Sequence, residues 1–447
     1  MTDDDTGRQP AATDLPEPVL EGLAAHATAA PTDPGAPPDD LAALDDRLGN
    51  AAVVGLGEAS HGSREFFRAK HRLIRHLVRE HDLGAVAFEA NLPEARAIDA
   101  YVRGGDGDPV AALEGVYFWI WTVEAVLELL EWLRSYNAGR PPADQVRFYG
   151  LDAQYTAGAV ASLRSFLEAV DPDALDAVAG DLALADDEGV PPHQDDRRRE
   201  RAAAVDRLAR ALRERIAARE AAYTEQAGAD RLERARRDLR VLEQAAAHRR
   251  AVEARASAAD PRPEHTERVL RVRDRAMAEN AGWVADRTDG PVAVWGHDAH
   301  LNRVAQRSRT ADAAAPSMGA DLAARYGDGY LAVGFSAERL GFQAMGPEGD
   351  GDGYTLRGFT VEGPLAGTTE AAVAAATDGP VVVDLRAGRE DPRLREWLAT
   401  PRDHLSVGAT FEPGQPRAYT TAYAHGDAFD LLWHVPGTER ARPAGDG

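Results

Sequence analysis

Acidic and histidine side chains follow the ends of four short apolar runs in this sequence. The runs lie in AAVVGLGE, GAVAFE, QVRFYGLD and PVAVWGHDAH. The side chains that follow them are Glu58, His61, Glu89, Asp152, His297 and His300. A neutral imidazole can take a proton from water near neutral pH, and a carboxylate beside it stabilises the imidazolium that forms. These residue types therefore indicate a site that transfers protons.

The same side chains could instead bind a metal ion. His297 and His300 are three residues apart, and Glu58, Glu89 and His61 could complete a set of nitrogen and oxygen ligands. This spacing is less specific than the H-E-x-x-H motif on a helix. The pattern alone leaves a metal site and a metal-free acid–base site equally open.

Lys70 is the only lysine of the chain, because every other basic residue among the 51 is an arginine. It lies in a predicted helix over residues 64–81, on the apolar face that includes Phe67 and Leu73. In one interpretation its stem packs on that face while its ammonium group reaches solvent. In the other, Lys70 belongs to the site and pairs with a carboxylate such as Glu58 or Glu89.

A dense aromatic segment, YFWIW, occupies residues 117–121. These side chains could belong to the hydrophobic core, or they could form one wall of a pocket for a bulky, partly apolar ligand. In the second interpretation Trp119 and Trp121 contact the substrate. Asp152 and Tyr155, at and after the end of the third apolar run, are the other candidates for substrate binding.

The elements that position these residues are predicted from the apolar runs themselves. Continuous valine-rich runs are typical of a parallel sheet buried on both faces. In such sheets ligands bind outside the carboxyl ends of the strands. A single acid at a strand end is more often a helix cap or a turn residue. Four strand ends that carry titratable groups to one edge are therefore the strongest indication of a site.

The whole chain is predicted to be an α/β protein with a parallel-sheet, three-layer core. An Ala-, Arg- and Glu-rich stretch predicts a long, lid-like helical insertion, and short strands near the end predict a small C-terminal α+β subdomain. The expected parts are a disordered N-terminal tail (1–38), the first part of the catalytic core (39–156), the helical insertion (157–282), the remainder of the core with the small subdomain (283–437) and a frayed tail (438–447).

Composition excludes several classes of protein. The formal charge of −23, from 74 acidic and 51 basic residues, argues against nucleic acid and anionic membranes as partners. The acid excess with almost no lysine is typical of a salt-adapted, halophilic microbe. The chain has no cysteine, which excludes disulfides and a cysteine nucleophile. No secretion signal or long apolar segment is evident, so we expect a cytoplasmic protein. Oligomeric state is not readable from the sequence.

Three common catalytic or binding motifs are absent. The sequence contains no G-x-S-x-G elbow, no G-x-x-x-x-G-K-[ST] loop, and no G-x-G-x-x-G that opens a helix after a strand. The usual serine hydrolase and nucleotide-binding interpretations therefore lack support.

Five ordered blocks of the sequence resemble the erythromycin esterase family. They are GLGEASHGSREFFRAKHRLIRHLV, VAFEAN, RFYGLDAQY, RVRDRAMAENAGWV with VAVWGHDAHL, and SMGADLAARYGDGY. The resemblance covers roughly residues 40–435. It implies a parallel-sheet α/β core with a helical insertion, and hydrolysis of a lactone or ester, such as a macrolide antibiotic, without a required metal or other cofactor.

The resemblance also implies roles for individual residues. His61 corresponds to the general base that activates water, Glu58 and Glu89 orient it or share its proton, and His297 and His300 line the same cleft. Lys70 falls where the family tends to keep a basic side chain that faces the site. Asp298 stands where asparagine is commoner, and an added carboxylate there can alter the pKa of a neighbouring group.

Three functions remain to be compared with the structure. The first is a hydrolase of a small-molecule ester or lactone. The second is a metal-dependent hydrolase that uses the same histidine and glutamate cluster. The third is a small-molecule binding protein that retains the fold, although a binder has no evident need for so many titratable groups.

Overall fold

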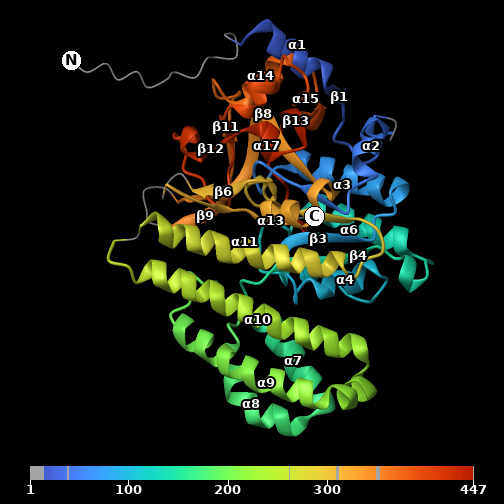
Figure 1. Cartoon of the computed structure of the whole chain (residues 1–447), viewed down its shortest axis with the longest axis vertical. Helices are drawn as coiled ribbons and strands as arrows, with labels where there is room; N and C mark the ends of the chain where they lie inside the picture. The colour runs from blue at the N-terminus through green and yellow to red at the C-terminus, as the bar shows by residue number, and fades with distance from the viewer. Residues whose placement is uncertain (1–14, 38–39, 261, 309–311, 349–352, 446–447) are drawn as a thin grey trace.

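A computed structural model describes residues 15–37, 40–260, 262–308, 312–348 and 353–445. Within these residues a nine-stranded sheet forms the centre of the molecule, with the order β1-β10-β13-β8-β2-β5-β3-β4 and with β9 paired to β8 (Figure 1). Its strands are β1 (Ala27–Ala29), β2 (Val53–Leu56), β3 (Ala85–Asn91), β4 (Arg147–Asp152), β5 (Val292–Trp295), β8 (Tyr330–Pro347), β9 (Tyr354–Val361), β10 (Val381–Asp384) and β13 (Leu431–Gly437).

The middle of this sheet is parallel, as the apolar runs predicted. β2 pairs in parallel with β5 and β8, and β3 pairs in parallel with β5 and β4. Every residue of β2, β3 and β5 is buried. Burial on both faces explains why these strands appear in the sequence as continuous apolar runs rather than as alternating ones.

Helices cover both faces of the sheet and give the three layers. One apolar core lies between the sheet and the helices α3 and α6, and a second lies between the sheet and α1, α11, α13 and α14. The helices of these layers are α1 (Glu17–Ala25), α2 (Asp45–Leu48), α3 (Arg64–Glu80), α4 (Arg96–Val102), α5 (Pro109–Glu114), α6 (Glu124–Asn137), α11 (Pro263–Ala285), α12 (Asp298–Leu301), α13 (Met318–Tyr326) and α14 (Thr369–Ala376). The α/β fold class is therefore confirmed.

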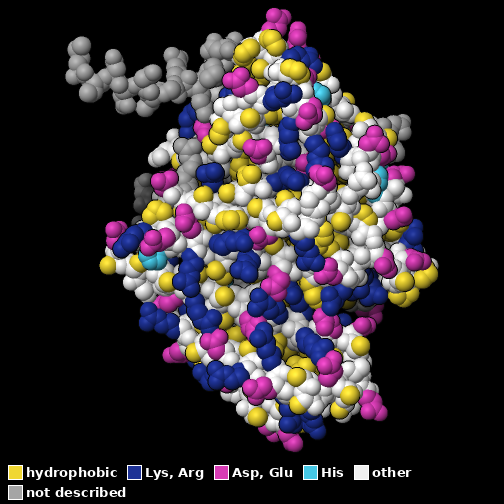
Figure 2. Space-filling model, viewed as in Figure 1, with side chains coloured by type: hydrophobic (Ala, Val, Ile, Leu, Met, Phe, Trp, Pro, Cys, Tyr) yellow, Lys and Arg dark blue, Asp and Glu magenta, His cyan; other side chains and the backbone are white. Residues whose placement is uncertain are grey.

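The predicted insertion is helical and has a core of its own. Its helices are α7 (Ala157–Val170), α8 (Pro172–Ala185), α9 (Arg198–Ala227) and α10 (Ala229–Ala256), and they form the lower end of the molecule in Figure 1. Figure 2 shows basic and acidic side chains interspersed over this part of the surface, and pairs such as Arg207 with Asp181 join neighbouring helices. α11 differs from the others because it packs on the sheet through Met277 and Ala281. No helix in the described part of the chain has the length and apolarity that a membrane span requires.

The C-terminal strands are divided between the central sheet and smaller sheets. β10 and β13 extend the central sheet, and β8 continues beyond its parallel part to pair with β9 in an antiparallel hairpin. The smaller elements are β6 (Ala305–Ser308), β7 (Ala313–Pro316), β11 (Arg402–Leu405), β12 (Thr420–Tyr423), α15 (Leu385–Gly388), α16 (Arg395–Ala399) and α17 (His425–Ala428). The hairpin and the β11–β12 sheet lie outside the parallel core, whereas β10 and β13, which were predicted to belong to the small subdomain, are part of the central sheet.

Both predicted tails are partly wrong. Residues 1–14, 38–39 and 446–447 lie outside the described residues, but α1 buries Val19 and Leu23, and β1 pairs with β10 at the edge of the sheet. At the other end, Ala441 is fully buried and the chain bridges to Ser63 and Val123. The N-terminal segment is ordered by the apolar face of α1 and by the pairing of β1 with β10, and the C-terminal segment is ordered by its contacts with distant loops.

Candidate active site

The register of the sheet brings the predicted side chains to one edge. Leu56 of β2 pairs with Trp295 of β5, which pairs with Phe88 of β3. The residues that follow these partners therefore emerge side by side, as the convergence of parallel strand ends predicts. Glu58, Glu89, Asp152, His297 and His300 are all at most 4% exposed, and His61 is 8% exposed.

Glu58 and His61 form a hydrogen-bonded pair. His61 Nδ1 lies 2.7 Å from Glu58 Oε1, and the second carboxylate oxygen accepts from the Lys70 ammonium and from Trp295 Nε1 at 3.1 Å. Because the carboxylate accepts at Nδ1, the His61 ring carries its proton there, and its Nε2 is bonded to no described residue. The pair thus orients one imidazole nitrogen with a free lone pair.

The loop that carries His61 is fixed by close backbone contacts. The carbonyl oxygen of Gly62 accepts from the N–H groups of Gln343 in β8, at 3.2 Å, and of Ala441, at 2.7 Å. A Cβ atom at position 62 would lie 2.4 Å from the backbone oxygen of Gln343, so only glycine allows this approach. The C-terminal segment therefore supports the loop of the candidate general base.

Lys70 belongs to the site rather than to the surface. It is fully buried, and its ammonium group lies 4.5 Å from the centroid of the Trp295 ring and 5.5 Å from that of Phe335. Burial lowers the pKa of Lys70 to about 8, although the negative charge of Glu58 opposes this shift. The pairing alternative for Lys70 is the one that the contacts support, with Glu58 as its partner.

Glu89 is surrounded by a guanidinium from α11 and by two groups from the turn that begins α12. Its Oε1 accepts from Arg273 Nη2 at 2.7 Å and lies 3.2 Å from His300 Nε2, and its Oε2 accepts from the His297 backbone N–H at 3.0 Å. Burial alone would raise the pKa of Glu89, but the charges of His300 and Arg273 hold it well below the usual range. Glu89 is therefore a fixed carboxylate.

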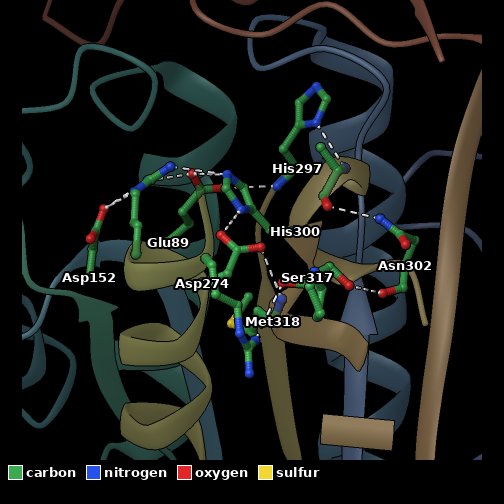
Figure 3. Close-up of polar contacts among 12 residues, drawn as sticks. Glu89, Asp152, Asp274, His297, His300, Asn302, Ser317 and Met318 are labelled. Carbon is green, nitrogen blue, oxygen red and sulfur yellow. Dashed lines mark hydrogen bonds and ion pairs between the residues drawn. The ribbon is translucent and has the colours of Figure 1, made fainter. Parts of the chain in front are cut away.

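His300 lies between two carboxylates. Its Nδ1 lies 2.7 Å from Oδ1 of Asp274 in α11, and Figure 3 shows the two side chains pointing toward one another. Burial lowers its pKa, but Asp274 and Glu89 outweigh that effect and raise it to about 10. The two carboxylates thus favour the imidazolium form, with Nδ1–H donating to Asp274, while Nε2 lies 3.2 Å from Glu89 Oε1 and 3.0 Å from Arg273 Nη1. The other oxygen of Asp274 accepts from the Met318 N–H at 3.0 Å.

His297 points away from His300 in Figure 3 and has a different role. Its Nδ1 accepts from the Ala299 N–H at 3.0 Å, and its Nε2 donates to the Val407 carbonyl at 3.1 Å. Burial and the neighbouring His61 hold its pKa well below the usual range. Both nitrogens of this neutral ring are therefore in use, and the ring packs 4.8 Å from that of His61.

The four residues assigned to substrate binding lie in different environments. Asp152 is buried and accepts from Arg273 Nη2 at 2.7 Å, so it belongs to the Glu89 network. Trp121 is fully buried and donates to the Glu89 carbonyl, which makes it core behind the site rather than a pocket wall. Trp119 is half-buried against the same core. Tyr155 is 7% exposed, and its ring lies 4.7 Å from that of Tyr117.

Asp298 is buried behind the loop that begins with Gly57. Its Oδ2 lies 3.2 Å from His404 Nε2, its Oδ1 has no hydrogen-bond partner among the described residues, and burial raises its pKa. A Cβ atom at position 57 would lie 1.8 Å from Oδ1, which explains the glycine there. The Asp298 N–H donates to the Glu58 carbonyl at 3.0 Å, so the turn after β5 is tied directly to the loop after β2.

Three important side chains were missed from the sequence. Arg273 and Asp274 lie in α11, in a stretch where arginine and acidic residues recur at nearly every turn, so nothing in the local pattern distinguishes them. The block RVRDRAMAENAGWV was part of the family resemblance, and it was the one available signal. Trp295 ends an apolar run, and nothing in the sequence distinguishes it from an ordinary core residue.

The donor atoms of the site do not gather as metal ligands do. Among the described residues, the one group of at least three His, Asp or Glu side chains whose ligand atoms lie within 4.8 Å of one another is Asp45, His76 and His81, in another part of the molecule. His297 has no free nitrogen, and His300 donates from Nδ1 to Asp274. The histidine and glutamate set thus does not fit a metal centre as it stands.

Comparisons with known proteins agree with the fold. A family model described as erythromycin esterase matches residues 78–438, a range that includes Glu89, His297 and His300 and begins after Glu58, His61 and Lys70. An erythromycin esterase type II of Escherichia coli is 28% identical over 142 residues, which cover 31% of this chain and only 33% of that enzyme. The Bacillus subtilis protein YbfO, provisionally named a hydrolase, is 24% identical and is aligned over 83% of this chain and 82% of its own.

Solved structures show the same fold at low identity. A Bacillus cereus protein has a TM-score of 0.79 at 23% identity and covers 95% of this chain and 98% of its own. A variant of an erythromycin esterase, in its open conformation, has a TM-score of 0.67 at 18% identity and covers 94% of this chain and 99% of its own.

Proposed function

Because the chain belongs to the erythromycin esterase family and is therefore a hydrolase, we propose that it cleaves a carboxylic ester or lactone of a small molecule with water activated by His61. The observation that carries this proposal is the Glu58–His61 pair, in which a fully buried carboxylate fixes Nδ1 and leaves Nε2 free. This is the arrangement that a histidine general base requires.

The reaction uses groups that the chain itself supplies. His61 Nε2 takes a proton from water while the water oxygen bonds to the ester carbonyl carbon, and a tetrahedral oxyanion forms. When that intermediate collapses, the bond to the alcohol oxygen breaks, and the imidazolium returns its proton to the departing alkoxide. Glu58 stabilises the imidazolium between these two steps, and Lys70 with Trp295 keeps Glu58 in place.

The Glu89 network lies at the same carboxyl end of the sheet as the Glu58–His61 pair. Arg273 joins Glu89 to Asp152, and His300 joins Glu89 to Asp274. Such mutual pairing holds each charge at a defined position without movement during the reaction, which favours preorganised electrostatic stabilisation. We assign these residues to positioning of the substrate and of the His297–His300 turn.

The family membership supports the proposed substrate class, and Trp119 and Tyr155 are the aromatic residues that we assign to it. A macrolide lactone is one candidate, and Trp119 with Tyr155 is the proposed apolar contact. The proposal needs no metal ion, and the commitment of both His297 nitrogens and of His300 Nδ1 supports that form of it.

Hydrolysis of a panel of esters and lactones, macrolides included, tests this function in low and in molar salt. Wild type is compared with His61→Ala and with wild type that has been dialysed against a chelator. We expect activity in the wild type, loss in His61→Ala and no effect of the chelator. Activity that the chelator abolishes and a divalent ion restores would establish the metal-dependent alternative. Binding without any turnover, unchanged in His61→Ala, would favour the non-catalytic one.

A further inference from the structure

We propose that Asp45, His76 and His81 form a binding site for a divalent transition-metal ion of the zinc class. His76 Nε2 lies 2.7 Å and His81 Nε2 lies 2.8 Å from the same oxygen of Asp45. Two imidazole nitrogens and one carboxylate oxygen are a ligand set that zinc prefers, with water in a fourth position. The proposed function uses none of these three residues.

The three donors need only a small adjustment to hold an ion. Zinc lies about 2.0–2.2 Å from nitrogen and oxygen ligands, so tetrahedral donors are about 3.3 Å apart. The two histidine–Asp45 separations are about 0.5 Å shorter, as expected for hydrogen bonds, and the three donor atoms lie within 4.8 Å of one another. The Asp45 side chain is 42% exposed, and it can move outward by that distance while the histidines stay where they are.

The surroundings of the site favour this interpretation. His76 is 4% exposed, and its Nδ1 has no hydrogen-bond partner among the described residues, so Asp45 is the one described side chain that holds this ring by a hydrogen bond. The two imidazole rings lie edge to face with centroids 5.5 Å apart, which directs both Nε2 atoms toward Asp45. The exposed side of Asp45 leaves room for a water ligand.

The site lies at the opposite edge of the sheet from His61. Asp45 is the first residue of α2, which precedes β2 in the chain. His81 follows the last residue of α3, the helix that runs from the carboxyl ends of the parallel strands back to their amino ends (Figure 1). An ion bound there would join the segment before β2 to the end of α3. Its expected effect is on the stability of the folded chain, because binding to the native state alone raises the unfolding midpoint.

Cobalt(II) titration of the chelator-treated full-length chain tests the proposal, because tetrahedral cobalt with nitrogen ligands gives visible absorption bands. Zinc competition then gives the affinity by calorimetry, and the thermal midpoint is recorded with and without zinc. His81→Gln, His76→Gln and Asp45→Asn are the test variants. His26→Gln is the matched control, because His26 is a histidine paired with a single aspartate, Asp391. His61→Ala removes a histidine of the active site.

We expect one ion per chain in the wild type, in His26→Gln and in His61→Ala, together with a zinc-dependent rise in the thermal midpoint. Each test variant should bind at least about 100-fold more weakly and lose that rise. Circular dichroism without metal shows which variants are folded. If His76→Gln is not folded, the partly exposed variant Asp45→Asn tests the loss of metal binding instead. The proposal is wrong if the wild type binds no cobalt, if the test variants bind as the wild type does, or if only His61→Ala abolishes binding.

Discussion

Glu58 and Glu89 are both buried acids near the carboxyl ends of β2 and β3, the two strands that flank β5, yet their surroundings differ. Glu58 faces one ammonium group, one indole N–H and the imidazole of His61. Glu89 faces a guanidinium, an imidazolium and a backbone N–H. The cations around Glu89 hold its pKa well below the usual range, whereas Lys70, the cation beside Glu58, has its pKa lowered to about 8.

This difference separates two tasks within one site. The Glu58 side contains the Glu58–His61 pair and a lysine whose pKa is lowered to about 8, so it suits proton transfer. The Glu89 side is a closed set of ion pairs, so it suits fixed positioning. The comparison predicts that substitutions on the Glu58 side mainly reduce the rate of the chemical step, and that substitutions on the Glu89 side mainly reduce stability.

The largest effect is expected from Glu58→Gln. The amide keeps the shape of the side chain but removes the charge that stabilises the His61 imidazolium, so kcat should fall by about 10³–10⁴-fold with little change in KM. Steady-state kinetics on the substrate found in the panel measures this. Glu80→Gln, at the exposed end of α3, is the matched control and should behave as wild type. Less than tenfold loss in Glu58→Gln would remove Glu58 from the proton-transfer step.

Lys70→Met should have the next largest effect on rate. Methionine has a similar volume but leaves the buried Glu58 carboxylate without its cation, and we expect kcat to fall by about 10²-fold. In the wild type, Lys70 loses its proton as the pH rises through about 8, so activity should decline there. The variant should lack this alkaline decline. An unchanged pH profile would show that Lys70 does not act on Glu58.

Much of the fold could be predicted from the sequence, because buried parallel strands are local apolar runs. The residues on the Glu58 side of the site could also be predicted, since Glu58, His61 and Lys70 belong to one strand–helix unit. Only some of the residues on the Glu89 side could be predicted from the sequence. Its histidines and acids mark strand ends, but Arg273 is one of many arginines in the helical region, and only the packing of α11 on the sheet selects it.

Other errors had the same origin in long-range contacts. Whether Trp121 lines a pocket or fills the core depends on which way its side chain faces, and the structure places it under Glu89. The first described residues include β1, which is held in place by pairing with β10, a strand that is remote in the sequence.

Arg273→Met tests the positioning side and should change stability more than rate. Removing the guanidinium leaves Glu89 and Asp152 without their shared cation, so we expect a loss of about 3–5 kcal/mol in the free energy of unfolding. Urea denaturation measures it, and kcat should fall only about tenfold. Arg275→Met, exposed two residues along the same helix, should leave both quantities near the wild type. A folded, fully stable Arg273→Met protein would contradict the comparison.

The smallest effect is a change in the pH dependence of stability in Asp274→Asn. The folded-state pKa of His300 is raised to about 10 from an ordinary 6.5, so its contribution is complete below pH 6.5 and is lost as the pH rises through 10. The variant brings that pKa closer to 6.5, and its urea midpoint should therefore fall less than that of the wild type between pH 6.5 and 10.

Two features make this measurement specific. Lys70 contributes with the opposite sign between about pH 8 and its ordinary 10.5, but it is common to both proteins and cancels in their difference. Asp286→Asn, which removes an exposed partner of Arg325, is the control and should keep the wild-type slope. If Asp274→Asn and the control have equal slopes, the assigned charge of His300 is wrong.

The burial of the single lysine has a practical consequence. A protease that cleaves only after lysine has one site in the whole sequence, at Lys70, and that residue is fully buried in the middle of α3. The native chain should therefore resist this protease completely, and cleavage into two fragments should occur only when α3 leaves the sheet. The rate of that single cut would report directly how often the helix beside the proposed general base unfolds.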